Sequence, residues 1–173
     1  MVKDMVRVLI TAIFLSLTTT GFSQTVAYFF SPGIRIGFNP GNGATISAQV
    51  SLGFIAQNQS YSLVFGGKMP LFRSIGNAYE KHNFLEFQIA RYEWRSNGFA
   101  TAGMGILFYK RNQKSQIRPK ISIGGGVLAF RSFYFPGAHL QTSLELAFLG
   151  EHDLMIDFGG KAAFPLLFIG LGY

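Results

Sequence analysis

The stretch Ala44–Ile55, ATISAQVSLGFI, alternates between apolar and polar or small residues from Ala44 to Phe54. Successive side chains of a β-strand point to opposite faces, so a period of two residues gives this strand two unlike faces. One face is apolar, and the other is polar, small and uncharged. This combination is typical of a narrow barrel whose outside contacts lipid and whose interior is filled with small polar groups.

The same alternation recurs along the chain, with turn signals between the segments. Asn39–Gly43 (NPGNG) and the Asn-Gly pair at Asn97 are two such signals. We therefore predict an all-β fold, a closed antiparallel up-and-down transmembrane β-barrel. The alternating segments are residues 34–38, 44–55, 61–66, 85–90, 99–109, 117–127, 140–148 and 154–161.

The end of the chain leaves the strand count open between eight and ten. Phe164–Tyr173 also alternates and reads either as the end of one long, kinked eighth strand or as a separate strand. In the second case Thr25–Phe30 would supply an additional first strand. Bacterial single-chain barrels have even strand numbers, and the weak N-terminal segment favours eight.

Composition supports a membrane barrel of one domain. Of the 173 residues, 49% are hydrophobic and only 13% are charged, against about 25% charged in average soluble domains. Beyond the N-terminal segment Val8–Leu17, no apolar run approaches the ~20 residues of a membrane helix. Cysteine is absent, which excludes disulfides, thiolate metal sites and a cysteine nucleophile.

The first 23 residues are typical of a signal peptide. Lys3 and Arg7 precede a short apolar core, Val8–Leu17, and a tail of small residues ends at Ser23. We expect cleavage after residue 23 and a barrel domain over 24–173; a permanent N-terminal anchor is the alternative. Removal of Lys3, Arg7 and Asp4 leaves 13 basic and 7 acidic residues, a net charge of +6. An exported chain does not meet nucleic acid routinely, so this charge favours lipid phosphates as the anionic partner.

Isolated charges fall on the polar faces of the predicted strands. In a closed interior they would neutralise one another through ion pairs, because an unpaired buried charge is costly. Solvent-facing charges of a soluble sandwich are the alternative, and a soluble exported lipocalin-like barrel with an apolar ligand would alternate in the same way. The predicted interior network consists of Arg35, Glu86, Arg118, Lys120, Glu145, Asp157 and Lys161.

Aromatic residues cluster near the predicted strand ends, as in the interface girdles of transmembrane barrels. At the C-terminus, Tyr173 follows Leu167, Ile169 and Leu171 at alternate positions. With this motif and its architecture, the chain resembles the small outer-membrane β-barrels of Gram-negative bacteria, the class of the OmpA transmembrane domain and OmpX. The resemblance implies an outer-membrane location and recognition of the Tyr173 segment by the assembly machinery. The clusters are Tyr28–Phe30, Tyr92 with Trp94, Tyr109, and Phe133–Phe135.

Residues able to support catalysis are few. His82, His139 and His152 lie in or beside predicted loops, and no pair of them has a metal-binding spacing; we expect neither a metal nor a cofactor. Some barrels of the resembled class modify lipid A, but the His–Ser spacing here departs from the deacylase pattern. His139, Ser143 and Glu145 remain an alternative set of base, nucleophile and orienting acid at a rim.

A basic group on the predicted 111–116 loop is the strongest candidate for surface binding. Lys110, Arg111 and Lys114 would contact lipopolysaccharide phosphates through charge-assisted hydrogen bonds. A merely solvated loop is the alternative. We expect a monomeric, non-enzymatic outer-membrane barrel with a plugged interior and a structural or surface-binding role.

Overall fold

The computed structural model describes residues 26–39, 43–71, 82–93, 95–111, 114–129, 138–148, 154–164 and 167–171. Within these ranges no helix is long and apolar enough to cross a membrane. The predicted signal peptide and Tyr173 lie outside them. The strands are β1 (Val26–Asn39), β2 (Gly43–Ala56), β3 (Gln59–Pro70), β4 (His82–Glu93), β5 (Gly98–Arg111), β6 (Lys114–Ala129), β7 (Ala138–Phe148), β8 (Leu154–Ala163) and β9 (Leu167–Leu171).

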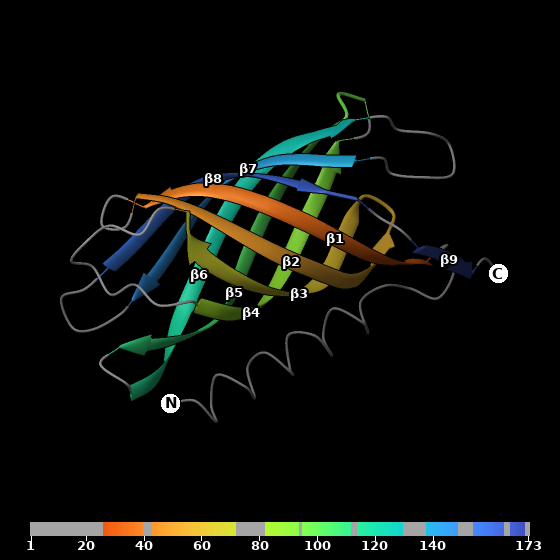
Figure 1. The fold of residues 1–173 in the computed structure, drawn as a ribbon. Coiled ribbons are helices and arrows are strands. Elements are labelled where there is room, and N and C mark those ends of the chain that lie inside the picture. The colour runs from red at the N-terminus through yellow and green to blue at the C-terminus, as the bar shows by residue number, and fades with distance from the viewer. Residues whose placement is uncertain are drawn as a thin grey trace.

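The strands form one closed antiparallel barrel (Figure 1). Each strand from β1 to β7 pairs with the next strand along the chain. β1 closes the barrel by pairing with both β8 and β9. Gly33–Phe38 pair with Phe158–Ala163, whereas Val26–Phe30 pair with Leu167–Leu171. β8 and β9 therefore share one position beside β1 as an interrupted eighth strand. Eight strands are confirmed, and the ten-strand alternative is wrong because residues 26–30 continue into β1.

Proline accounts for the interruption between β8 and β9. Pro32 lies in β1 opposite the gap, and its carbonyl accepts a hydrogen bond of 2.9 Å from the Phe164 amide. Proline has no N–H to return, so a ladder cannot continue on that side of β1. Pro165, which directly follows Phe164 in the sequence, adds a second residue without a donor.

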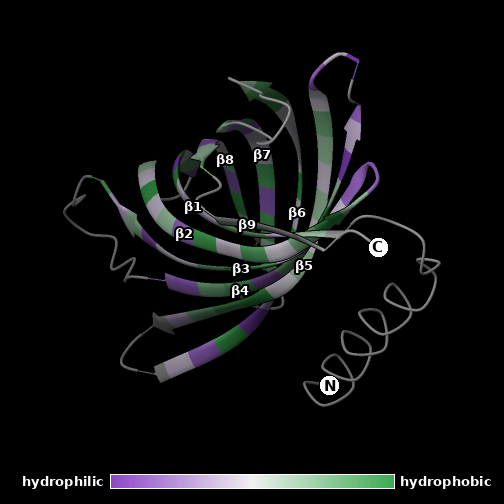
Figure 2. Cartoon of the chain, turned by 90° about the vertical axis from the view of Figure 1, so that its right-hand side faces the viewer, coloured by the Kyte–Doolittle hydropathy of each residue, from purple (hydrophilic) through white to green (hydrophobic). Residues whose placement is uncertain are grey.

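The alternation seen in the sequence separates the two faces of the barrel wall. In β2, Ser47 and Ser51 are buried, while Ala48 and Leu52, the residues that follow them, are exposed on the outside. Apolar and polar residues alternate along the strands in the same way in Figure 2. Large exposed apolar residues ring the outer surface, including Ile34, Ile36, Phe38, Phe65, Met69, Ile89, Met104, Ile117, Ile121, Ile123, Val127, Leu140, Phe148 and Phe158.

The bore is filled in layers. At the end that carries Val26 and Leu171, here called the terminal end, Tyr92 packs on Phe99 with ring centroids 5.7 Å apart, beside Ala90 and Leu128. Charged side chains occupy the middle. A second buried apolar cluster lies toward the opposite end and consists of Val64, Phe84, Leu107, Tyr109, Ala147 and Met155.

Only part of the expected aromatic girdle faces outward. Tyr28 is exposed on the outer face, but Tyr92 and Tyr109 are buried in the bore. Both follow the inward parity of their strands, β4 and β5, so periodicity rather than nearness to a turn decides their direction. Trp94 and Phe133–Phe135 lie outside the described residues.

Candidate functional site: the ion-pair network of the bore

Six charged side chains from six strands meet in the middle of the bore. Every one of them lies at an inward position of its strand, because the period of two places it on the same face as the buried serines. Each side chain is no more than 6% exposed. The network consists of Arg35 (β1), Lys68 (β3), Glu86 (β4), Lys120 (β6), Glu145 (β7) and Asp157 (β8).

Arg35 is held by β7 and β8. One of its terminal nitrogens donates to the Asp157 carboxylate, and its Nε donates to Ser143 Oγ at 3.1 Å. Gly37 and Gly159 make room for the guanidinium, because a Cβ at either position would lie within 2.8 Å of its atoms. Glycine is therefore required at positions 37 and 159, because the Arg35 side chain occupies the space that a Cβ would take.

Glu145 is the centre of the network. Its carboxylate lies 2.8 Å from Lys68 Nζ, 3.4 Å from Arg35 Nε and 3.4 Å from Lys120 Nζ. Lys68 also reaches Asp157 Oδ2 at 3.0 Å. One carboxylate thus contacts all three cations, so each cation is compensated by two carboxylates.

Glu86 completes the network on the β4–β6 side of the bore. It accepts hydrogen bonds from Lys120 Nζ and Ser122 Oγ, and the Lys120 ammonium lies 4.1 Å from the centroid of the Phe84 ring. Lys120 therefore joins the ionic layer to the apolar cluster beyond it. A cation over an aromatic face adds a favourable electrostatic contact in such a dry setting.

The two remaining predicted members, Arg118 and Lys161, lie apart from these ion pairs. Both are partly buried, and Arg118 donates to Gln116 Oε1 at 2.9 Å. Lys161 lines an internal cavity on the terminal side of the network. Lys68 was not predicted, because the alternation was followed only to Gly66; continuing the even-numbered parity of β3 by one more step would have found it.

The alternative catalytic set is not brought together as a triad. His139, Ser143 and Glu145 share the inward face of β7, but four residues of strand separate His139 from Ser143, which is roughly 13 Å at 3.3 Å per residue. His139 instead packs against Phe99 with ring centroids 5.3 Å apart. Ser143 Oγ accepts from Arg35, and Glu145 is bound by three cations, so neither is positioned to serve the histidine.

A metal site is not seen among the residues that the structure describes, where no three His, Cys, Asp or Glu side chains are grouped to hold an ion. His82 is buried at the start of β4, with its ring 5.8 Å from Tyr109. His152 lies outside the described ranges.

The predicted basic surface group lies at one hairpin. Backbone pairing puts Arg111 opposite Lys114 and Lys110 opposite Ser115, where β5 turns into β6. This hairpin is at the end of the barrel opposite the terminal end, which carries Val26 and Leu171. The side chains of Lys110, Arg111 and Lys114 are not among those that the structure describes, so their anion binding stays a prediction.

Comparison with known proteins shows similarity at the level of the fold. No protein-family model and no curated protein matches the chain. It is similar to the crystal structure of Neisserial surface protein A, with a TM-score of 0.50, 7% identity and coverage of 80% of this chain and 96% of that one. It is also similar to a de novo designed transmembrane β-barrel, with a TM-score of 0.46, 14% identity and coverage of 80% and 95%.

Proposed function

We propose that this chain is an integral β-barrel protein of a bacterial outer membrane, with a closed bore and a structural or surface-binding role. The observation that carries the proposal is the inverted distribution of its side chains. Apolar residues are exposed around the outside, while three carboxylates and three cations are buried in the bore. A water-soluble barrel would present its charges to the solvent.

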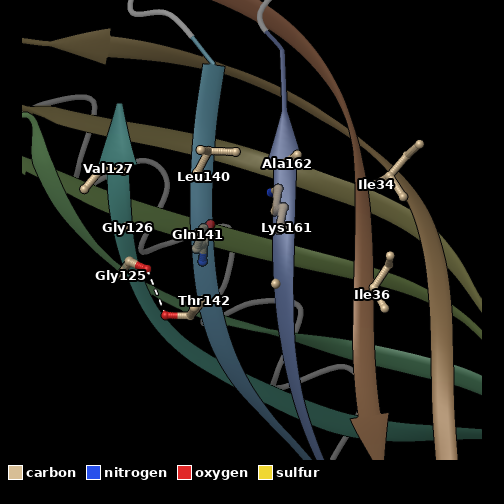
Figure 3. Close-up of a pocket in the computed structure, with 11 residues that line it drawn as sticks. Ile34, Ile36, Gly125, Gly126, Val127, Leu140, Gln141, Thr142, Lys161 and Ala162 are labelled. Carbon is tan, nitrogen blue, oxygen red and sulfur yellow. Dashed lines mark hydrogen bonds between the residues drawn. The ribbon is translucent and has the colours of Figure 1, made fainter. Parts of the chain in front are cut away.

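The outer surface suits lipid. Ile123, Ile34 and Ile36 are each close to 60% exposed, and they belong to an apolar belt formed by the outward-facing residues of the described strands. Soluble monomers rarely expose large apolar patches. Figure 3 shows part of this belt as a shallow groove, with Ile34 and Ile36 on one side and Val127 and Leu140 on the other. Even the hydroxyl of Thr142 on this face is satisfied, since it donates to the Gly125 carbonyl at 3.3 Å.

An aromatic row near the terminal end fits a membrane–water interface. Tyr28, Phe54 and Tyr61 are neighbours in register on the outer faces of β1, β2 and β3. Their ring centroids lie 6.3 Å and 5.2 Å apart along the row. The Tyr61 hydroxyl donates to Gln59 Oε1 at 2.6 Å. Amphipathic rings at the edge of the apolar belt are typical of transmembrane barrels.

The contents of the bore support a closed barrel. Ion pairs fill its middle and buried apolar clusters lie on both sides. Eight-stranded barrels have room only for side chains, whereas aqueous channels have about 16 strands. The internal cavity found among the described residues has hydroxyl, amide and lysine side chains in its lining, unlike the apolar pocket in which a lipocalin-like carrier would hold its ligand.

Within this proposal, the eight-strand topology gives the loops an orientation. The termini of transmembrane barrels of this kind lie on the periplasmic side with short turns, and the longer loops are extracellular. The β5–β6 hairpin with Lys110, Arg111 and Lys114 then faces outward, where lipopolysaccharide phosphates are the available anions. Assembly would proceed through the C-terminal segment that ends at Tyr173.

Fractionation and electrical recording test the proposal together. Expressed with its own signal segment, the chain should remain in the outer-membrane pellet after a carbonate wash, and its gel mobility should change on boiling. In planar bilayers it should give no steady conductance. Release into the wash would reject the membrane location, whereas persistent conductance would reject only the closed bore. Salt-dependent binding to lipopolysaccharide that is lost in K110Q/R111Q/K114Q would support the surface role.

A further inference from the structure

We infer that the bore holds one small monovalent anion, of the chloride class, between the ion-pair network and the aromatic plug at the terminal end. The inference concerns the inside of the barrel and does not depend on the proposed function. The site is an internal cavity of ≈ 20 Å³. Its lining includes five short hydroxyl side chains: Ser31, Ser51, Ser60, Ser62 and Thr101.

Lys161 supplies the positive charge. Its side chain lines the cavity, and its register partner on β1 is Arg35, a like charge on the same inward face. Like charges opposite each other in a sheet repel. Arg35 is drawn to the other side by Asp157, where its guanidinium packs over Gly159. The ammonium of Lys161 is thereby left on the cavity side.

The carboxylates of the bore are already used by other cations. Glu86, Glu145 and Asp157 form ion pairs with three cations, and none of these ion pairs includes Lys161. Across the central layer of the described strands, four cations therefore face three carboxylates. Glu86 and Glu145 also attract the Lys161 ammonium electrostatically, but the layer keeps one net positive charge. A net charge inside a barrel is unfavourable, so a counter-ion has an energetic role here.

Unused hydrogen-bonding atoms surround the same cavity. Ser31 is 4% exposed, and its hydroxyl has no partner among the described residues. The Nε2 of His139 is likewise buried without a partner. A hydroxyl and an imidazole N–H are both donors to an anion. The amide of Gln141 already donates to Thr101 Oγ1 at 2.8 Å, which fixes that part of the wall.

Size selects the class of anion. A site of this volume exceeds the ~10–15 Å³ needed for one water molecule and accepts one ion of similar radius. A monatomic halide is the anion nearest to this size, whereas sulfate, phosphate and organic acids are larger. A water molecule alone would use the free donors but would leave the charge of Lys161 uncompensated.

The direct test uses the mature protein folded in detergent micelles. Thermal unfolding is followed at constant ionic strength while sodium gluconate is replaced by chloride or bromide. The midpoint should rise by about 3–6 °C at ten times the dissociation constant, and above it with the logarithm of the halide concentration. Crystals grown with bromide should show an anomalous peak in contact with Lys161 Nζ and Ser31 Oγ.

Two variants assign the site. K161M removes the charge with little change of length and should abolish the halide dependence. R118M removes a bore cation outside the cavity and should retain it. If K161M does not fold, S31A, which keeps the lysine, should weaken the halide response. An unchanged midpoint in halide, a cavity holding only water, or a bromide peak that persists in K161M would each overturn the inference.

Discussion

Neutralising the central carboxylate of the bore, E145Q, should destabilise the barrel more than any other isosteric change in the network. Glutamine keeps the shape but removes the charge that contacts Lys68 at 2.8 Å and both Arg35 and Lys120 at 3.4 Å. Three buried cations would then share two carboxylates. Removing one member of a buried ionic set costs about 3–5 kcal/mol, because its partners stay buried without compensation.

Urea unfolding in lipid vesicles measures this cost, with gel mobility and the fluorescence of Trp94, the chain's single tryptophan, as readouts. At a denaturant slope of about 2 kcal/mol/M, the midpoint of E145Q should lie roughly 1.5–2.5 M below wild type. The matched control is E93Q, since Glu93 is exposed and its side chain accepts a 3.3 Å hydrogen bond from the Arg95 amide. Its stability should change by less than about 0.5 kcal/mol. Equal midpoints for E145Q and wild type would refute the view that the network is tightly coupled.

Three further outcomes follow from the geometry. G103A should cost about 1–3 kcal/mol in urea unfolding because the new Cβ would lie 2.2 Å from Glu86 Oε1, whereas G160A, whose Cβ meets its nearest atom at 4.0 Å, should be tolerated; equal stability of the two would contradict this packing. I123R should cost about 2–4 kcal/mol in lipid bilayers, since Ile123 faces outward; no cost in bilayers would argue against lipid contact there. Y92F removes the 3.1 Å hydrogen bond to Ser60 and should cost about 1 kcal/mol; if the double variant Y92F/S60A is as stable as S60A, the Tyr92–Ser60 hydrogen bond is the cause of the loss. If Y92F lowers the free energy of unfolding by the same amount in the S60A background, that bond is excluded as the cause.

Side-chain direction was accessible from the sequence because it depends only on parity along each strand. The predicted apolar faces, such as Ile34, Ile36 and Phe38 in β1 and Ala48 and Leu52 in β2, are exposed on the outside of the barrel. The same rule placed Arg35, Glu145 and Asp157 on the inner face. The odd or even place of a residue in its strand also decides the direction of side chains near strand ends. Tyr92 and Tyr109 both lie near strand ends, and both point into the bore.

Pairing partners were not accessible from the sequence, since they depend on register between strands. Whether Arg35 meets Asp157 or Glu86 follows from how β1 aligns with β8, and no pattern within either strand encodes that alignment. The sequence also does not show that β8 and β9 occupy one strand position beside β1. It requires knowing that Pro32 lies opposite the gap. Lys161 could be placed in the bore by parity, but its exclusion from the ion pairs is a result of register.

Labels on two adjacent residues of β6 test the central claim, that the apolar face contacts hydrocarbon. The chain has no cysteine, so I123C and S122C each introduce a unique site for a spin label in protein folded into lipid bilayers. Ile123 is exposed on the outer face, and Ser122 is buried in the bore. The label at 123 should be relaxed by lipid-soluble oxygen and not by a water-soluble nickel complex. Relaxation of the 123 label by the nickel complex, with protection from oxygen, would contradict the account.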